Sequence, residues 1–322
     1  MNELSVPIKS NTGIIPEVIY YLANIKEFEY SYKYYNLRHP GAIFNLTSTH
    51  LIRDFLILLD ELSYYQNNFD SSKEIKLQKM YKQLIDGFFK FYDSFFEIIQ
   101  ACSKQHTPPT EKEFAWQWLV NNKYNAGKYL FNETKMEIEE LKFIYDELKH
   151  SSNYLQPVYF YKDKFSIMGY YLQSVESDGS IGPNIRLHPN YENMHVASSY
   201  NFNLRILYYL IYKISDILKN VLLLHFKETY DIVISKNMDY KGEDRLWKEL
   251  TEKIINLPKI YFPNEVNQRI PICYVSDTQL IFKIEKANGY GYNDLQVSFL
   301  ESSDGFSRSF RMPYYNPQIN KK

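Results

Sequence analysis

An α+β fold dominated by a helical bundle is what this 322-residue sequence predicts, and three observations lead to it. Apolar residues recur at helical spacing through most of residues 14–255. Inside that stretch, the run "QPVYFYKDKFSIMGYYLQSV" is rich in aromatic and β-branched residues and predicts a β-hairpin insertion at about 156–176. After residue 257, "IPICYVSDTQLIFKIEK" and "LQVSFLE" alternate as strands do. We therefore expect a helical part at 1–257, with the insertion, and a small β-rich C-terminal module at 258–322.

The first two helices are expected on either side of the run "LRHPGAIF". Residues 16–35 begin with a proline, which suits the first turn of a helix. The following segment, "STHLIRDFLILLDELSYY", carries an apolar stripe that must face a core, formed by Leu51, Phe55, Leu58, Leu59 and Leu62.

Residues 73–100 are predicted to form the most buried helix, because their apolar residues cover far more than one face. Ser71 and Glu74 have the spacing of a capping box at its start. Thr110 and Glu113 repeat this spacing ahead of a shorter helix, whose Phe114 and Trp118 are expected to point inward together.

The next helix is expected at about 132–150, with Met136, Leu141, Tyr145 and Leu148 roughly in phase. Its acidic residues come early and Lys149 and His150 come late, as the helix dipole prefers. Two further helices are predicted at about 201–226 and 241–256, the first with an apolar, buried character.

Composition excludes several classes of function. Lys and Arg number 37 against 38 Asp and Glu, so a net charge of -1 gives no global field that would attract nucleic acid or an anionic membrane, which leaves a local basic patch as the route to RNA. The 31 tyrosines are interpreted as half-buried positions with an apolar body and a wet tip, rather than as a stacking surface. Cys102 and Cys273 are far apart in sequence and form no CxxC pattern, so we expect neither a disulfide framework nor a cysteine-rich zinc site. With no signal peptide and no apolar run of about 18 residues, we expect a soluble, cytoplasmic protein.

One polar cluster is the candidate catalytic site. The stretch "KFIYDELKHSSNY" ends a helix with Lys149, His150 and Asn153, which are the residues that we select. The same cluster also has a structural interpretation. A protonated histidine and a lysine in the last turn of a helix interact favourably with the helix dipole, and the polar residues that follow can bond the free carbonyl groups of that turn. We favour this structural interpretation.

Other chemistries can be drawn from the same stretch. Asp146 lies one turn before His150 and Ser151 or Ser152 follows it, as in a nucleophile arrangement, although no nucleophile elbow accompanies them.

A metal site is the other alternative. Glu147 and His150 have the i, i+3 spacing of di-iron carboxylate bundles, which Glu192 and His195 repeat. His188 with His195 would suit zinc, but no third ligand is evident. We expect no cofactor and no bound metal.

A helix that ends in "LKHSSN" within a helical bundle resembles the HEPN superfamily of bacterial helical proteins, some of which are metal-independent RNases. In that family an Arg precedes the catalytic His by four to six residues, whereas Phe143, Ile144 and Tyr145 occupy the corresponding positions here. The resemblance implies that His150 matches the family's histidine and that Asn153 is an accessory polar group. Without the arginine, the scissile phosphate has no charge partner.

Two functions from different classes follow. The first is a non-enzymatic interaction protein that forms a homodimer through helix faces or contacts a protein partner through the aromatic hairpin and the terminal strands. The alternative is a HEPN-like RNA-associated protein or RNase centred on Lys149, His150 and Asn153. A di-iron carboxylate bundle ranks below both.

Overall fold

The computed structural model of the chain describes most of the sequence, with gaps between the described ranges. These ranges are residues 1–8, 14–23, 31–68, 76–104, 107–110, 113–150, 153–162, 165–175, 179, 181–191, 194–230, 244–266, 268–287, 298–303 and 306–311. The expected capping box at Ser71 and Glu74 and the turn "NGYGYND" lie outside them.

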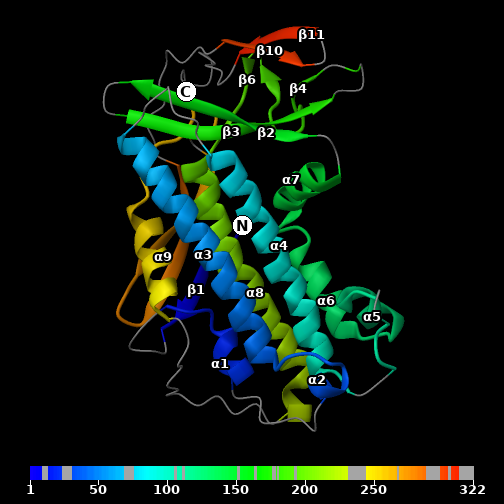
Figure 1. The fold of residues 1–322 in the computed structure, drawn as a ribbon. Helices are drawn as coiled ribbons and strands as arrows, with labels where there is room; N and C mark the ends of the chain where they lie inside the picture. The colour runs from blue at the N-terminus through cyan, green and yellow to red at the C-terminus, as the bar shows by residue number, and fades with distance from the viewer. Residues whose placement is uncertain are drawn as a thin grey trace.

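Long helices form the body of the protein, and small sheets lie against it, antiparallel except for the pair β11–β6 (Figure 1). The described helices are α1 Val18–Ala23, α2 Ser31–Tyr34, α3 Pro40–Asn67, α4 Leu77–Cys102, α5 Ala115–Asn121, α6 Asn125–Thr134, α7 Glu139–His150, α8 Tyr200–Tyr230 and α9 Asp244–Asn256. The described strands are β1 Leu4–Pro7, β2 Tyr154–Lys162, β3 Phe165–Val175, β4 Ile181–Pro183, β5 Asn190–Tyr191, β6 Met194–His195, β7 Ser198–Ser199, β8 Arg269–Val275, β9 Gln279–Lys286, β10 Ser298–Ser303 and β11 Phe306–Arg311. The predicted α+β class is confirmed.

Aromatic packing joins α3 to α4. The ring of Phe44 on α3 lies 5.3 Å from that of Phe91 and 6.0 Å from that of Phe95, both on α4. The whole predicted stripe of α3, from Leu51 to Leu62, is buried in this core. Truncating a fully buried phenylalanine such as Phe95 to alanine costs about 3 to 5 kcal/mol in cores of this kind.

The predicted 73–100 segment forms α4, whose phenylalanines are all buried, and α8 is a second deeply buried helix. Within the described part of the chain, α4 is buried on several sides, but α8 carries more of the largest fully buried side chains: Tyr200, Arg205, Tyr208, Tyr209 and Tyr212. Its neighbours explain this burial, because α8 contacts α1, α4, α6, α9, β3, β7 and β8. Several of these tyrosines are fully buried rather than half-buried, and their hydroxyls bond inside the fold.

The predicted hairpin is confirmed as β2 and β3, which pair antiparallel with Tyr154 opposite Gln173 and Lys162 opposite Phe165. It lies across one end of the helical body (Figure 1). Both faces of β3 are buried: Met168, Tyr170 and Leu172 join the helical core, and Ile167 and Tyr171 pack on the opposite face with Val158, Ala197 and Phe262. Strand β3 is therefore an internal strand, bordered by β2 on one side and by β4 and β7 on the other.

A close backbone approach fixes β7 against β3. Gly169 pairs with Ser199, and a Cβ at position 169 would lie 2.1 Å from the carbonyl oxygen of Ser198. Because the obstructing atom belongs to the backbone, a larger residue requires the two strands to separate.

The strands after residue 257 join sheets with strands from earlier in the chain. Strand β1 pairs with β9 in the order β1-β9-β8, and β11 pairs with β6 in the order β10-β11-β6-β5. The division into 1–257 and 258–322 stays a prediction, and these shared sheets connect the two ranges.

Helix α3 starts earlier than expected. It begins inside the run expected to interrupt it, because the ring nitrogen Nδ1 of His39 accepts a bond from the Gly41 N–H at 3.1 Å and Pro40 fits the first turn. The expected helix 16–35 is represented by α1 and α2, with residues 24–30 outside the described ranges.

Two expectations between Thr110 and His150 are wrong. The predicted 132–150 helix is two helices, since α6 ends at Thr134, whose hydroxyl bonds the Leu130 carbonyl at 2.8 Å and Tyr92 at 2.7 Å. Met136 consequently lies in the turn between them and is 80% exposed.

Phe114 is 75% exposed, whereas Trp118 is buried as expected. The reason is that α5 starts at Ala115, with Phe114 in extended backbone before it.

One helix in the described part of the chain, α3, has the length and apolar character to cross a membrane. Half of its most apolar window is buried inside the fold. A core helix passes the same test of length and composition, and α3 packs as a core helix against α4.

Candidate functional site

The predicted site at the end of α7 is held by contacts within the fold. The ammonium of Lys149, on the surface, donates to the Tyr145 hydroxyl at 2.8 Å and lies 4.9 Å from the centre of that ring. This hydrogen bond raises the pKa of Lys149. Lys149 is therefore a cation that anchors to its own helix and is unsuited to act as a base.

Asn153 has a structural partner as well. It is buried, and its side-chain amide donates to a carboxylate oxygen of Glu147. Lys82 on α4 donates to the carbonyl oxygen of Leu148 at 3.1 Å, which satisfies one of the free carbonyls in the last turn. These contacts support the structural interpretation of the cluster. The side chain of His150 and residues Ser151 and Ser152 lie outside the described part.

The other arrangements drawn from this stretch find different partners. Asp146 forms an ion pair with Lys142 one turn earlier on α7. The carboxylate of Glu147 accepts from Asn153, and Glu192 is outside the described ranges. No group of three His, Cys, Asp or Glu side chains in the described residues is arranged to hold a metal ion.

The two histidines considered for zinc form hydrogen bonds inside the fold. His188 is fully buried, and its Nε2 accepts from the backbone N–H of Leu172 at 2.8 Å. Burial lowers the pKa of His188 to about 3, so the ring is neutral. His195 bonds through Nδ1 to the carbonyl of His188 at 2.7 Å and through Nε2 to Asn190 at 3.2 Å. Both rings thus secure the segment between β4 and β7.

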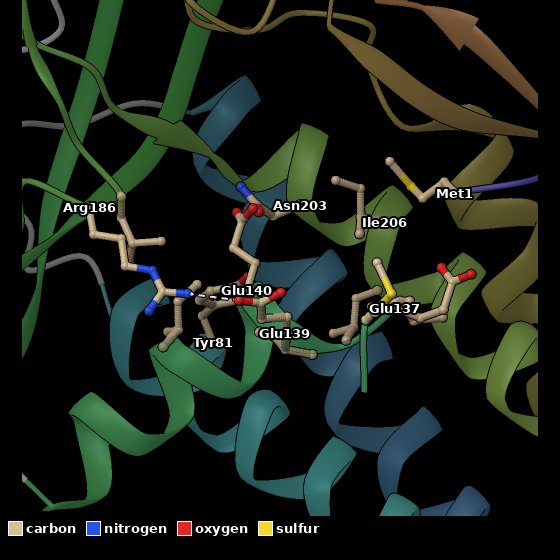
Figure 2. A pocket seen from close by; sticks show the side chains of 14 residues that line it. Met1, Tyr81, Glu137, Glu139, Glu140, Arg186, Asn203 and Ile206 are labelled. Atoms are coloured by element: carbon tan, nitrogen blue, oxygen red, sulfur yellow. Dashed lines mark hydrogen bonds and ion pairs between the residues drawn. The ribbon is translucent and has the colours of Figure 1, made fainter. Parts of the chain in front are cut away.

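A cavity of about 410 Å³ lies where the first turn of α7 faces α8 (Figure 2). Its walls come from four segments besides the N-terminal residue: Tyr81 of α4, residues 136–144 around the start of α7, Arg186 and Leu187 after β4, and Asn203, Ile206, Leu207 and Leu210 of α8. Leu141, Ile144, Leu207 and Leu210 are almost completely buried, so the floor is apolar. The volume lies within the range of about 300 to 1,000 Å³ typical of small-molecule sites.

Charged groups gather on one side of this cavity. The guanidinium of Arg186 donates to Glu139 at 3.2 Å and lies 4.2 Å from the centre of the Phe143 ring. Figure 2 shows Arg186, Glu139 and Glu140 together, with Asn203 and Ile206 beyond them on α8. Burial raises the pKa of Glu140, and the nearby Arg186 opposes this shift. Its side chain also keeps access to solvent.

The sequence predictions missed this cavity. Among its lining residues, Met136 and Leu141 were selected in advance, and both as apolar positions in phase on a helix. The cavity combines segments far apart in sequence, so no spacing rule connects them. The two adjacent glutamates at the start of α7 are the one local signal, and they are also what the helix dipole favours there.

Comparisons with known proteins return no relative: no family model, no curated protein and no solved structure matches the chain. The resemblance to the HEPN superfamily therefore rests on the motif at the end of α7. Any assignment of function has to come from the contacts themselves.

A buried carboxyl group holds the start of α8. Glu265 accepts from the backbone N–H and the hydroxyl of Ser199, both at 2.6 Å, and from the N–H of Phe262 at 2.9 Å. Ser199 precedes Tyr200, the first residue of α8, and its hydroxyl also accepts from the N–H of Phe202 at 3.3 Å. Burial outweighs these three bonds and raises the pKa of Glu265 to about 7.

We predict that Glu265 makes the protein less stable as the pH rises from about 4.5 to about 7. Between these values the folded protein retains a proton that the unfolded chain has released, so the free energy of unfolding falls with rising pH. Urea denaturation across this window should give a shallower decline for Glu265→Gln than for the natural protein. Identical slopes for the two proteins would contradict this assignment, whatever their absolute stabilities.

Proposed function

We propose that this chain is a non-enzymatic, cytoplasmic interaction protein that pairs with a second copy of itself along the outer edge of β2. The observation that carries the proposal is the position of this strand. Strand β2 is nine residues long and pairs with β3 on one side, while no strand of the described residues pairs with its other side.

An edge of this length supports association. Unpaired backbone N–H and C=O groups on an edge strand form a template for another strand, and soluble proteins normally blunt such edges. Pro157 removes one donor from β2, which weakens the edge without covering it. Tyr154, which is 62% exposed, adds apolar surface at one end of the strand.

A second copy suits this edge because an antiparallel pair of identical strands closes on a two-fold axis. With the axis at Val158, the middle of the strand, residue 154 of one copy faces residue 162 of the other. The sequence then sets Tyr154 opposite a lysine at both ends of the pair. The resulting sheet would continue from one subunit to the next.

The charge of α7 supports this proposal over an RNase. Helix α7 carries four acidic and two basic side chains besides His150, and Lys149 and Asn153 are engaged within the fold. An RNA-binding surface needs a basic patch for the phosphates. The acidic residues around the end of this helix oppose such binding.

We predict that the dimer responds to charge at position 154. Tyr154→Lys sets like charges opposite each other at both ends of the strand pair and should weaken association about tenfold or more, whereas Tyr154→Glu faces a lysine and should preserve it. Sedimentation equilibrium measures both constants. The matched control is Val275→Lys, because Val275 is a 47% exposed residue at the end of β8, away from the hairpin.

A monomer at all concentrations for the natural protein would contradict the proposal. If the lysine and glutamate variants weaken dimer association equally, the proposed register is wrong. In that case the loss of apolar surface at position 154 would be enough to explain both results.

We predict that neither the natural protein nor the folded variants His150→Ala and Asn153→Ala cleaves RNA. Incubation with end-labelled RNA in chelator, followed by electrophoresis, measures this directly. Cleavage by the natural protein that disappears in folded His150→Ala would establish the HEPN-like alternative in place of our proposal.

A further inference from the structure

We propose that the cavity between α7 and α8 binds a small organic cation, a primary ammonium group attached to an aliphatic body. This inference is independent of pairing along β2, since no residue of the hairpin lines the cavity.

The shape of the cavity fits the aliphatic body. Its deepest wall is built from Leu141, Ile144, Leu207 and Leu210, none more than 9% exposed. Partly buried Ile206 and Leu187 extend this wall toward the mouth. An apolar chain placed there loses contact with water and gains close packing against side chains that belong to the rigid core.

The charged groups at the mouth favour a positive ligand over a negative one. Arg186 is the one cationic side chain among the described residues that line the cavity, and Glu139 and the Phe143 ring already engage it. Glu137 lies 4.0 Å from the ammonium of Lys213. Both of these glutamates therefore have cationic partners within the fold.

Glu140 is different. It makes no hydrogen bond and no ion pair within 4 Å to any described residue, and Arg186 acts on it only from a longer distance. Glu140 is exposed beside the apolar wall, so an ammonium group can approach its carboxylate and form a charge-assisted hydrogen bond without displacing a partner from the fold.

A second acceptor lies on the facing helix. Asn203 donates its side-chain amide to the Ser199 carbonyl at 2.9 Å, which fixes the orientation of the side chain. Its carbonyl oxygen accepts no hydrogen bond from a described residue. A primary ammonium has several donors, so it can bind Glu140 and also this oxygen, whereas a quaternary ammonium cannot.

The test compares three probes of equal length on the full chain by isothermal titration calorimetry. These are hexylammonium, 1-hexanol and hexanoate, which differ in the charge of one end group. We expect hexylammonium to bind with one site per chain and about tenfold or more tightly than either of the others.

Two matched variants locate the charge. Glu140→Gln should remove the preference for hexylammonium over hexanol, a loss of about tenfold in affinity. The control Asp146→Asn removes a carboxylate from the same helix outside the cavity and should alter the affinity by less than about threefold. The thermal unfolding midpoint of each variant verifies that it is folded.

The remaining outcomes overturn the proposal. Preference for hexanoate would show that Arg186, not Glu140, governs the site. Equal affinity for all three probes would show an apolar cavity without charge selection. Absence of binding by hexylammonium, or full binding by the folded Glu140→Gln variant, would show that the cavity is not a site for a cation.

Discussion

Most of the polar side chains buried on α8 form hydrogen bonds inside the protein, and the placement of several other elements depends on these bonds. Tyr208 bonds Thr251 on α9 at 2.7 Å, and Tyr212 donates to the carbonyl of Ile14 at 2.9 Å. Arg205 donates to the carbonyls of Ile254 and Leu257, which satisfies the end of α9. Leaving such buried groups unpaired costs about 1 to 3 kcal/mol each, so α9 and the N-terminal segment can dock in few other ways.

The cavity and the free edge both follow from this arrangement. Helix α7 packs against α4, and the space left between α7 and α8 is the cavity with Glu140 at its mouth. At the same end of α8, β7 and the start of the helix hold β3 as an internal strand through the close approach at Gly169. Strand β2 then remains as the outer strand of that sheet.

Periodicity in the sequence predicted the long helices and the hairpin, because burial of one helical face or of alternate strand residues leaves a regular pattern. It failed where one side chain decides the outcome, as at Thr134, whose bonds to Leu130 and Tyr92 accompany the end of α6. The cluster at Lys149 and Asn153 was found in advance, and so was its structural interpretation. The cavity could not be predicted, since tertiary contacts alone bring Glu140 and Asn203 to the same space.

A double-mutant cycle between α8 and α9 tests most directly whether these buried hydroxyls determine the fold. In urea denaturation, Tyr208→Phe and Thr251→Val should each cost about 1 to 3 kcal/mol, and the double variant should cost about 1 kcal/mol less than their sum. Tyr209→Phe is the control, because the Tyr209 hydroxyl donates to the carbonyl of Asn2 at 2.8 Å and not to Thr251. Its effect should add to that of Thr251→Val within about 0.5 kcal/mol. Full additivity between Tyr208→Phe and Thr251→Val would contradict the account.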